Sequence, residues 1–208
     1  DVLEDGYGIN LRPLSMFAAS AYRDDPCTRF KPHILDQNIY DVVDPGLVAK
    51  MHKAITVMQF KVEGQIIKRH PEYGLNHRCL LEHVDFDKGT VEVDGKTYPM
   101  LDMKFPTIDP KDPLKLTEQE AELLQTLKMS FRHSGLLHKH IKFLYSHGSM
   151  YKCCNNNLLY HGCIQLKKDG SFDDIVFYGI PYSGKALMDF VDQMVQSAYF
   201  LPESNPDK

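Results

Sequence analysis

The stretch LYSHGSMYKCCNNNLLYHGCIQLKKDGSF, residues 144–172, holds the most informative pattern of the chain. Residues 148–163 within it predict two strands joined by an Asn-rich turn. Three consecutive asparagines, residues 155–157, can adopt the left-handed backbone conformations that most residues avoid. A second turn is expected at residues 167–172. The stretch therefore predicts a strand pair followed by a turn.

Helices are expected on both sides of this stretch. The clearest begins near Leu47, where apolar residues recur every three or four positions as far as Ile66, and Pro71 limits its length. Its other face carries lysines that are expected to be exposed to solvent: Lys50, Lys53, Lys61 and Lys68. The alternative is that these lysines, together with Arg69, attract a bisphosphate. A final helix is expected from Gly184, and it is expected to bury the residues of its apolar face: Leu187, Phe190, Val191, Met194 and Ala198.

Shorter local signals complete the expected elements. A helix is expected around residues 14–22, and Thr117 with Glu120 forms a capping box that opens another helix through about residue 131. Ser134 can cap the next helix. Asp-Gly at positions 94 and 95 predicts a tight β-hairpin over residues 90–100, because both residues accept positive φ. Three prolines predict an irregular connection at residues 105–116.

The composition excludes several classes of protein. Lys and Arg number 24 against 28 Asp and Glu, a formal net charge of −4 over 208 residues, which does not indicate a nucleic-acid-binding surface. No stretch approaches the roughly 20 consecutive apolar residues of a membrane span. Five scattered cysteines favour reduced thiols in the cytoplasm over a disulfide framework. The chain shows no secretory leader. Because it begins at Asp1 and not at a Met, we expect a piece of a longer protein.

His161 is the most distinctive of ten histidines. It follows the apolar strand at residues 158–160 and precedes Gly162, at the end of a strand where ligands are commonly held. Taken alone, this pattern favours a buried core histidine over a metal ligand, since one His makes no metal site. Surface positions are expected for histidines without metal-ligand spacing: His70, His77, His83, His138 and His140.

Two further candidates carry less specific patterns. Lys185 lies at the start of the predicted final helix, in the run Tyr182-Ser183-Gly184-Lys185, where free N–H groups attract anions. It is therefore a candidate substrate-binding residue, and an ordinary exposed lysine is the alternative. Cys153 and Cys154 are neighbours on a strand and face opposite sides, which favours small buried residues over a metal chelate. No Ser/His/Asp or Cys/His pattern indicates a nucleophilic catalyst.

The stretch at residues 144–172 resembles the corresponding part of class III fructose-1,6-bisphosphatase, a bacterial family of the calcineurin-like metallophosphoesterase superfamily. Four other stretches resemble the same family in the same order: DVLEDGYGINLRPLSMFA (1–18), KMHKAITVMQFKVEGQIIKRHPEY (50–73), FPTIDPKDPLKLTEQE (105–120) and GKALMDFVDQMVQSAYF (184–200). The resemblance therefore covers nearly the whole chain.

This resemblance implies a two-metal phosphatase, usually manganese-dependent, that removes the 1-phosphate of fructose 1,6-bisphosphate in gluconeogenesis. Of the superfamily motifs, only the lone-His motif is present, at residues 160–163, and it makes His161 a metal ligand. The GDxxDRG and GNH[DE] motifs are missing, and no catalytic residue is identifiable. Because one ligand cannot hold a dinuclear centre, we expect an interior-to-late fragment with negligible activity on its own.

The implied fold is α/β, a fragment of a four-layer αββα metallophosphoesterase with a largely helical insertion. Residues 1–40 would be a core segment and linker, residues 41–145 a mainly helical insertion with one β-hairpin, and residues 146–208 the C-terminal part of the core, a strand pair plus helix. The insertion would cover the active site and select the sugar, or form a subunit interface.

The expected partners are a sugar bisphosphate substrate, the missing part of the same chain and further copies in a homo-oligomer, with neither nucleic acid nor membrane. A partly exposed apolar face is expected where the missing part would pack, and such a face predicts self-association. The alternative to an enzyme is a non-catalytic oligomerisation or effector-binding domain.

Overall fold

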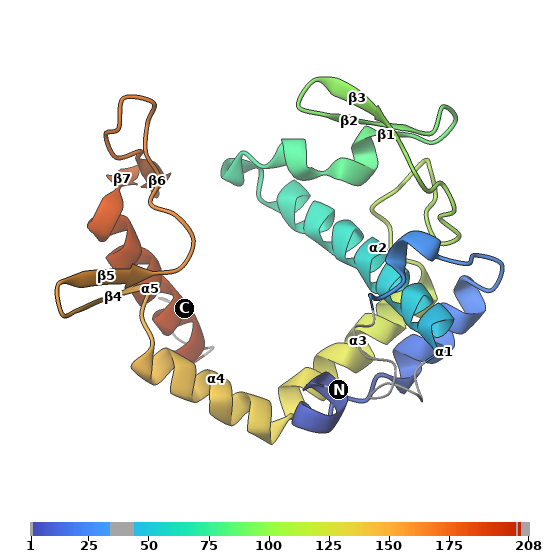
Figure 1. The fold of residues 1–208 in the computed structure, drawn as a ribbon, viewed down its shortest axis with the longest axis horizontal. Coiled ribbons are helices and arrows are strands. Elements are labelled where there is room, and N and C mark those ends of the chain that lie inside the picture. The colour runs from blue at the N-terminus through green and yellow to red at the C-terminus, as the bar shows by residue number, and fades with distance from the viewer. Residues whose placement is uncertain (1, 34–43, 203, 205–208) are drawn as a thin grey trace. The chain divides into compact units, whose positions relative to one another are not determined.

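A computed structural model of the chain describes residues 2–33, 44–202 and 204. It divides into two compact units, Asp1–Ser134 and Gly135–Lys208, whose elements are labelled in Figure 1. Their boundary is not one of those predicted from the sequence; the three-part division stays a prediction, and its boundary at residues 40 and 41 lies outside the described residues. Within the described ranges, no helix is long and apolar enough to cross a membrane.

The first unit is mainly helical, with one small sheet. Its longer helices are α1 (Arg12–Ala21), α2 (Pro45–Arg69) and α3 (Glu118–His133). Short π- and 3₁₀-helical turns occupy Val2–Gly6 (η1), Thr28–Phe30 (η2), Pro71–Tyr73 (η3), Asn76–Arg78 (η4) and Leu80–His83 (η5). The antiparallel sheet has the order β1 (Val84–Asp85), β2 (Thr90–Val93), β3 (Lys96–Pro99).

The second unit contains two helices and two separate antiparallel hairpins. The helices are α4 (Gly135–His147) and α5 (Gly184–Phe200). The hairpins are β4 (Tyr151–Cys154) with β5 (Asn157–Tyr160), and β6 (Ile175–Phe177) with β7 (Ile180–Tyr182). The predicted strand pair and final helix are therefore confirmed, whereas the β6–β7 hairpin was not expected.

Turn chemistry explains the β2–β3, β4–β5 and β6–β7 hairpins. Asp94 and Gly95 both have positive φ (51° and 72°), as the Asp-Gly signal predicts. Asn155 and Asn156 likewise adopt φ values of 49° and 59°. In the unexpected hairpin, the residues of the turn are Tyr178 and Gly179, again both at positive φ. A tyrosine rarely takes this conformation, so its presence in the first position masked the signal.

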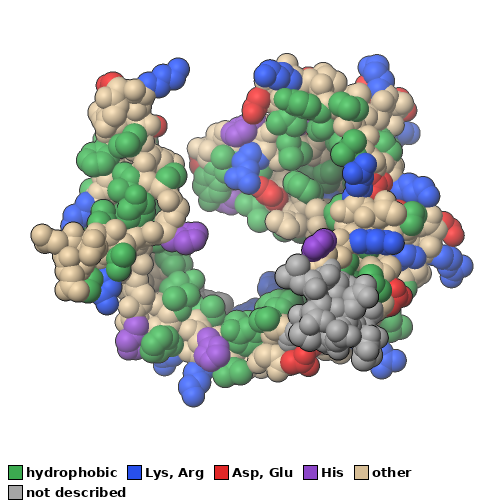
Figure 2. Space-filling view, in the orientation of Figure 1, with side chains coloured by type: hydrophobic (Ala, Val, Ile, Leu, Met, Phe, Trp, Pro, Cys, Tyr) green, Lys and Arg blue, Asp and Glu red, His purple; other side chains and the backbone are tan. Residues whose placement is uncertain are grey.

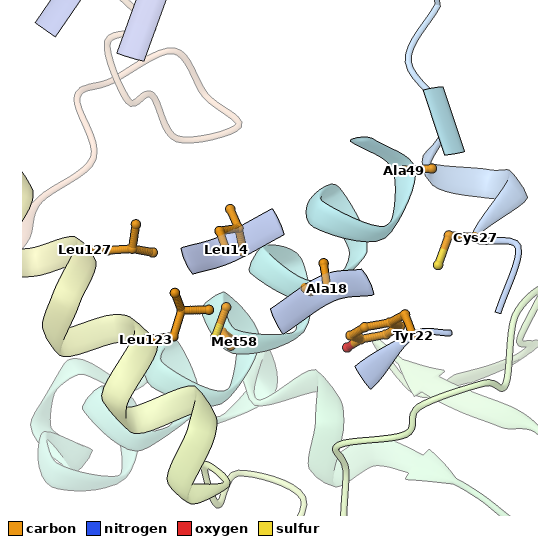
Figure 3. Packing of buried hydrophobic residues seen from close by; sticks show 9 residues of the cluster. Leu14, Ala18, Tyr22, Cys27, Ala49, Met58, Leu123 and Leu127 are labelled. Carbon is orange, nitrogen blue, oxygen red and sulfur yellow. The ribbon is translucent and has the colours of Figure 1, made fainter. Parts of the chain in front are cut away.

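The core of the first unit lies between α1, α2 and α3. Leu14 and Ala18 of α1 pack with Met58 of α2, and Leu123 and Leu127 of α3 face them in Figure 3. These side chains are at least nine-tenths buried. The three helices therefore form one hydrophobic cluster although about 100 residues of chain separate α1 from α3.

The buried face of α2 differs from the predicted apolar stripe. Met51 is only half-buried and Ile66 is 41% exposed. Met58 of the predicted stripe is buried. The other buried residues of α2 lie outside the stripe and include small ones and two lysines: Ala49, Lys53, Ala54, Val57, Lys61, Gly64 and Ile67. Small residues allow close approach of other segments; an added Cβ at Gly64 would lie 2.5 Å from a methyl carbon of Leu114.

The predicted exposed lysine face is wrong at Lys53 and Lys61, which are 0% exposed. The Lys61 ammonium lies 2.7 Å from Glu120 Oε2 and 2.6 Å from the carbonyl oxygen of Thr107. A buried charge needs such partners, and these come from segments at least 46 residues away, which local periodicity cannot reveal. Burial also removes both lysines from a role in attracting a bisphosphate.

Glu120 links two helices. Its Oε2 accepts a hydrogen bond from the Thr117 N–H at 2.8 Å, which completes the predicted capping box of α3, and it also binds Lys61 of α2. The first turn of α3 is therefore fixed by the same carboxylate that neutralises the buried ammonium.

Burial in the second unit differs from the prediction. None of its described residues is buried, although Leu187, Phe190 and Val191 of α5 are half-buried. The prediction that α5 buries its apolar face is wrong for the described structure, because two-stranded hairpins are too small to cover a helix. The expectation of exposed apolar side chains is confirmed, for example at Phe143 (64% exposed), and Figure 2 shows such side chains at the surface.

The buried pair in the first unit gives a stability prediction. We expect Lys61→Met to destabilise the chain by about 3–5 kcal/mol, because it leaves Glu120 charged and unpaired in the interior. Lys61→Met combined with Glu120→Gln should recover part of that loss. Urea unfolding measures both. Lys68→Met, which removes an exposed ion pair with Glu82, is the control and should change the midpoint little; equal effects of the two lysine substitutions would contradict the burial argument.

The ion pair of Asp25 predicts how the stability of the chain changes at acid pH. Burial raises the pKa of this carboxyl, but hydrogen bonds from Lys53 and from the Cys27 N–H outweigh it and hold the pKa below its ordinary 3.8. A lowered folded-state pKa stabilises the chain above the unfolded pKa, and this contribution is lost as pH falls through the folded value. We expect the stability difference between wild type and Asp25→Asn to shrink between about pH 5 and about pH 2 in urea titrations. A stability difference between the two proteins that does not change with pH would contradict this prediction.

Candidate functional site

His161 lies just after β5 and is exposed, so it is not the buried core histidine that the local pattern favoured. It lines a pocket of about 170 Å³ within the second unit. The pocket walls come from two extended segments and one helix: His161, Cys163, Ile164 and Gln165; Asp173, Ile175 and Phe177; Gly184, Leu187, Met188 and Val191; with Met150 beside them.

The two extended segments are aligned by backbone hydrogen bonds. The Asp173 N–H donates to the Gln165 carbonyl at 3.0 Å, and the Lys167 N–H donates to the Ser171 carbonyl at 2.8 Å around the predicted turn. Residues 173, 175 and 177 alternate along the second segment, and in an extended chain such residues share a face. The first segment bends at Gly162 (φ 89°) and contributes His161 together with three consecutive residues, Cys163, Ile164 and Gln165.

The helical wall follows from helix periodicity. Gly184, Leu187, Met188 and Val191 are spaced i, i+3, i+4 and i+7, the spacing of one helix face. Phe190 stacks on Tyr182 of β7 with ring centroids 4.3 Å apart, which holds the start of α5 against the hairpin. The polar lining groups are an imidazole, a thiol, an amide and a carboxylate, whereas the helix contributes an apolar wall.

The pocket does not by itself fit a metal centre. In the described parts of the chain, no group of three or more His, Cys, Asp or Glu side chains could hold a metal ion. His161 therefore offers one ligand. Asp173 and Cys163 line the same pocket. The sequence did not predict them as pocket residues, because Cys163 enters only as the last residue of the lone-His motif and Asp173 belongs to no motif.

The structure places Lys185 outside the residues that line this pocket. Its ammonium pairs with Asp189 Oδ2, one turn along α5, and lies 5.6 Å from the Tyr151 ring centroid. The Tyr151 hydroxyl donates to the other oxygen of Asp189 at 3.0 Å. The hydrogen bond to Asp189 raises the pKa of Lys185, and the one from Lys185 lowers the pKa of Asp189. A phosphate at Lys185 would compete with this carboxylate.

Two expectations about other residues can be compared with the structure. His77, His83, His138 and His140 are exposed, as predicted, while His70 is half-buried and binds Glu72. Cys153 and Cys154 are exposed, so the prediction of two small buried residues is wrong. Their strand belongs to an isolated hairpin with nothing in the described structure of this unit large enough to cover both of its faces.

The cysteines give a prediction about reactivity. Cys153, Cys154 and Cys163 are exposed, whereas Cys27 and Cys79 are buried. Burial, reinforced by Asp25, raises the pKa of the Cys27 thiol to about 11, and burial with the nearby Glu82 raises that of Cys79. The thiolate is the reactive form. Iodoacetamide at neutral pH should therefore modify three thiols in the folded chain and five in urea, counted by mass spectrometry. Early modification of Cys27 would contradict the structure.

Comparisons with known proteins give the family. A family model described as Firmicute fructose-1,6-bisphosphatase matches residues 1–208. The chain is 47% identical over 208 residues to fructose-1,6-bisphosphatase class 3 of Clostridium novyi, covering 100% of this chain and 31% of that protein. The protein of the same name from Listeria monocytogenes is 47% identical over 208 residues, with 100% and 32% covered. That of Alkaliphilus metalliredigens is 50% identical, with 99% and 31% covered.

No solved structure matches the chain. It spans about a third of the length of these curated relatives. The match of the family model nevertheless extends over every residue, and three relatives agree in name. The chain belongs to the Firmicute fructose-1,6-bisphosphatase family.

Proposed function

We propose that this chain is part of an enzyme that hydrolyses the 1-phosphate of fructose 1,6-bisphosphate in gluconeogenesis. The observation that carries the proposal is the family match over residues 1–208, together with 47–50% identity to relatives named for that activity. The exposed pocket of the second unit supports it, because a small polar substrate needs an accessible site that offers several hydrogen-bonding groups.

His161 is the proposed metal ligand of this chain. The support is the lone-His motif at residues 160–163 and the exposed place of His161 in the pocket. The cofactor of the complete enzyme is proposed to be a dinuclear divalent metal, manganese, of the metallophosphoesterase kind. Since His161 offers a single ligand, we expect no appreciable phosphatase activity from the 208 residues alone.

The chain's own pocket groups can position a sugar phosphate. The Gln165 amide can donate a hydrogen bond to a phosphoryl or hydroxyl oxygen, and the Asp173 carboxylate can accept one from a sugar hydroxyl. The apolar wall from Leu187 to Val191 limits the water around the bound group. Lys185 stays a predicted substrate-binding residue whose present partner is Asp189.

The finer fold and the cell compartment belong to the proposal as well. We propose that the second unit completes part of a four-layer αββα core and that the first unit belongs largely to a helical insertion. A cytoplasmic location is supported by the five cysteines, which are all free.

A segment exchange tests the function. The aligned segment of the Clostridium novyi relative is replaced by residues 1–208 of this chain, and phosphate release from fructose 1,6-bisphosphate is measured with manganese. The chimera should be active. His161→Ala should lower activity by about 100-fold or more, since even partners of metal ligands alter activity 10–100-fold, and should weaken manganese binding in calorimetry.

His77→Ala is the matched control, because His77 is an exposed histidine of the first unit. It should leave activity and manganese binding unchanged. A folded chimera without activity would overturn the proposed function. An active chimera that tolerates His161→Ala would instead overturn the role of His161 alone.

Homo-oligomerisation is a second proposed property, favoured by a specific observation. Large apolar side chains of the second unit are exposed on α4 and on both hairpins, among them Phe143, Leu159 and Val176 at 64%, 55% and 63%. Exposed apolar patches commonly mark interfaces. Sedimentation that shows a monomer at all concentrations would contradict self-association of this chain.

A further inference from the structure

A second charged site of the described structure, apart from the His161 pocket, surrounds the ammonium group of Lys53. This group lies 2.6 Å from Asp25 Oδ2 and 2.7 Å from Asp102 Oδ2. The Lys53 side chain is 0% exposed, and those of Asp25 and Asp102 are 8% and 22% exposed. Two carboxylates from distant parts of the chain therefore meet at one buried cation.

Three aromatic rings also lie close to this cation. The Lys53 ammonium lies 5.9 Å from the ring centroid of Tyr22, 5.8 Å from that of Phe30 and 5.4 Å from that of Phe105. Each distance is within the range of a cation–π contact. Three rings with two carboxylates are a combination that recognises organic ammonium groups, since the rings replace water without competing for hydrogen bonds.

The carboxylates are held in place independently of Lys53. The Cys27 N–H donates to Asp25 Oδ1 at 2.9 Å, and the Lys104 N–H donates to Asp102 Oδ1 at 3.0 Å. Each carboxylate thus presents its second oxygen to the cation from a local turn. With two negative groups facing one ammonium, the site retains a net attraction for positive charge.

We propose that Asp25, Asp102 and the three rings form a preorganised binding site for a primary ammonium ion, which the chain fills with its own Lys53. The site takes unbranched primary alkylammonium ions. The N–H groups of such an ion point at the two carboxylates, and its carbon chain follows the path of the lysine stem. A planar guanidinium or a quaternary ammonium does not match two oxygens at 2.6 and 2.7 Å from one nitrogen.

Filling this site from within joins two loops to α2. The loop after α1 and the loop after β3 supply the two carboxylates, 77 positions apart (102 − 25). The loops also touch directly, because Lys104 Nζ donates to the Asp24 carbonyl at 3.0 Å. A second lysine of α2, Lys50, donates from its Nζ to the Arg23 carbonyl at 2.9 Å. Lys53 therefore connects three segments of the first unit: α2, the loop after α1 and the loop after β3.

Chemical rescue tests the site. In Lys53→Ala the missing atoms are those of n-propylammonium, so this ion is the probe. We expect the variant to have a lower thermal midpoint than wild type and n-propylammonium to raise it in a saturable way, measured by circular dichroism. At ten times its dissociation constant, the ion should increase the folded-to-unfolded ratio about elevenfold. If Lys53→Ala does not fold alone, the folded fraction recovered on refolding with the ion is the readout.

Three controls give the test its specificity. 1-Propanol has the same chain length without charge, and tetramethylammonium has charge without N–H donors; neither should stabilise Lys53→Ala. Adding Asp102→Asn to Lys53→Ala should weaken the response to n-propylammonium. Wild type, whose site is filled by Lys53, should not respond.

Several outcomes would overturn the proposal. Equal effects of n-propylammonium and 1-propanol would mean that only apolar volume is restored. An equal response of wild type would mean a general solvent effect. Absence of any response, in a folded variant or during refolding, would mean that no ammonium site forms without the covalent lysine.

Discussion

Two buried ammonium groups on α2, those of Lys53 and Lys61, are the charges on which the organisation of the first unit depends. Each is fully buried and each is neutralised by carboxylates from other segments, Asp25 and Asp102 for one and Glu120 for the other. Because an unpaired charge in the interior is strongly unfavourable, α2 can pack only where these partners are present. These three ion pairs therefore specify the position of α2 against α3 and the surrounding loops as well as stabilising it.

The two units differ in how their elements are held. In the first, a hydrophobic cluster, a capping box and buried ion pairs support one another. In the second, rings stack between α5 and its hairpin, but no described residue is buried. The pocket that contains His161 lies in this second unit. Its geometry thus depends on short turns and on one helix face, not on a deep core.

Local chemistry was readable from the sequence where a turn or cap is self-contained. Thr117 and Glu120, Asp94 and Gly95, and the asparagine turn all behave as their residue types require. The β6–β7 hairpin was missed because a tyrosine occupies the first turn position. His161 was identified by a motif, whereas Gln165 and Asp173 are joined by a backbone hydrogen bond between two segments that no motif predicts.

The sequence by itself determined the family, the existence and type of most elements, and His161 as the residue to examine, because these follow from short-range patterns and from long matching strings. Only the tertiary structure decided which face of α2 is buried. Helical periodicity predicts an apolar stripe, but the energy of burying Lys53 and Lys61 depends on carboxylates 28 to 59 residues away. Contacts at that separation are set by how segments pack, which a single local pattern does not contain.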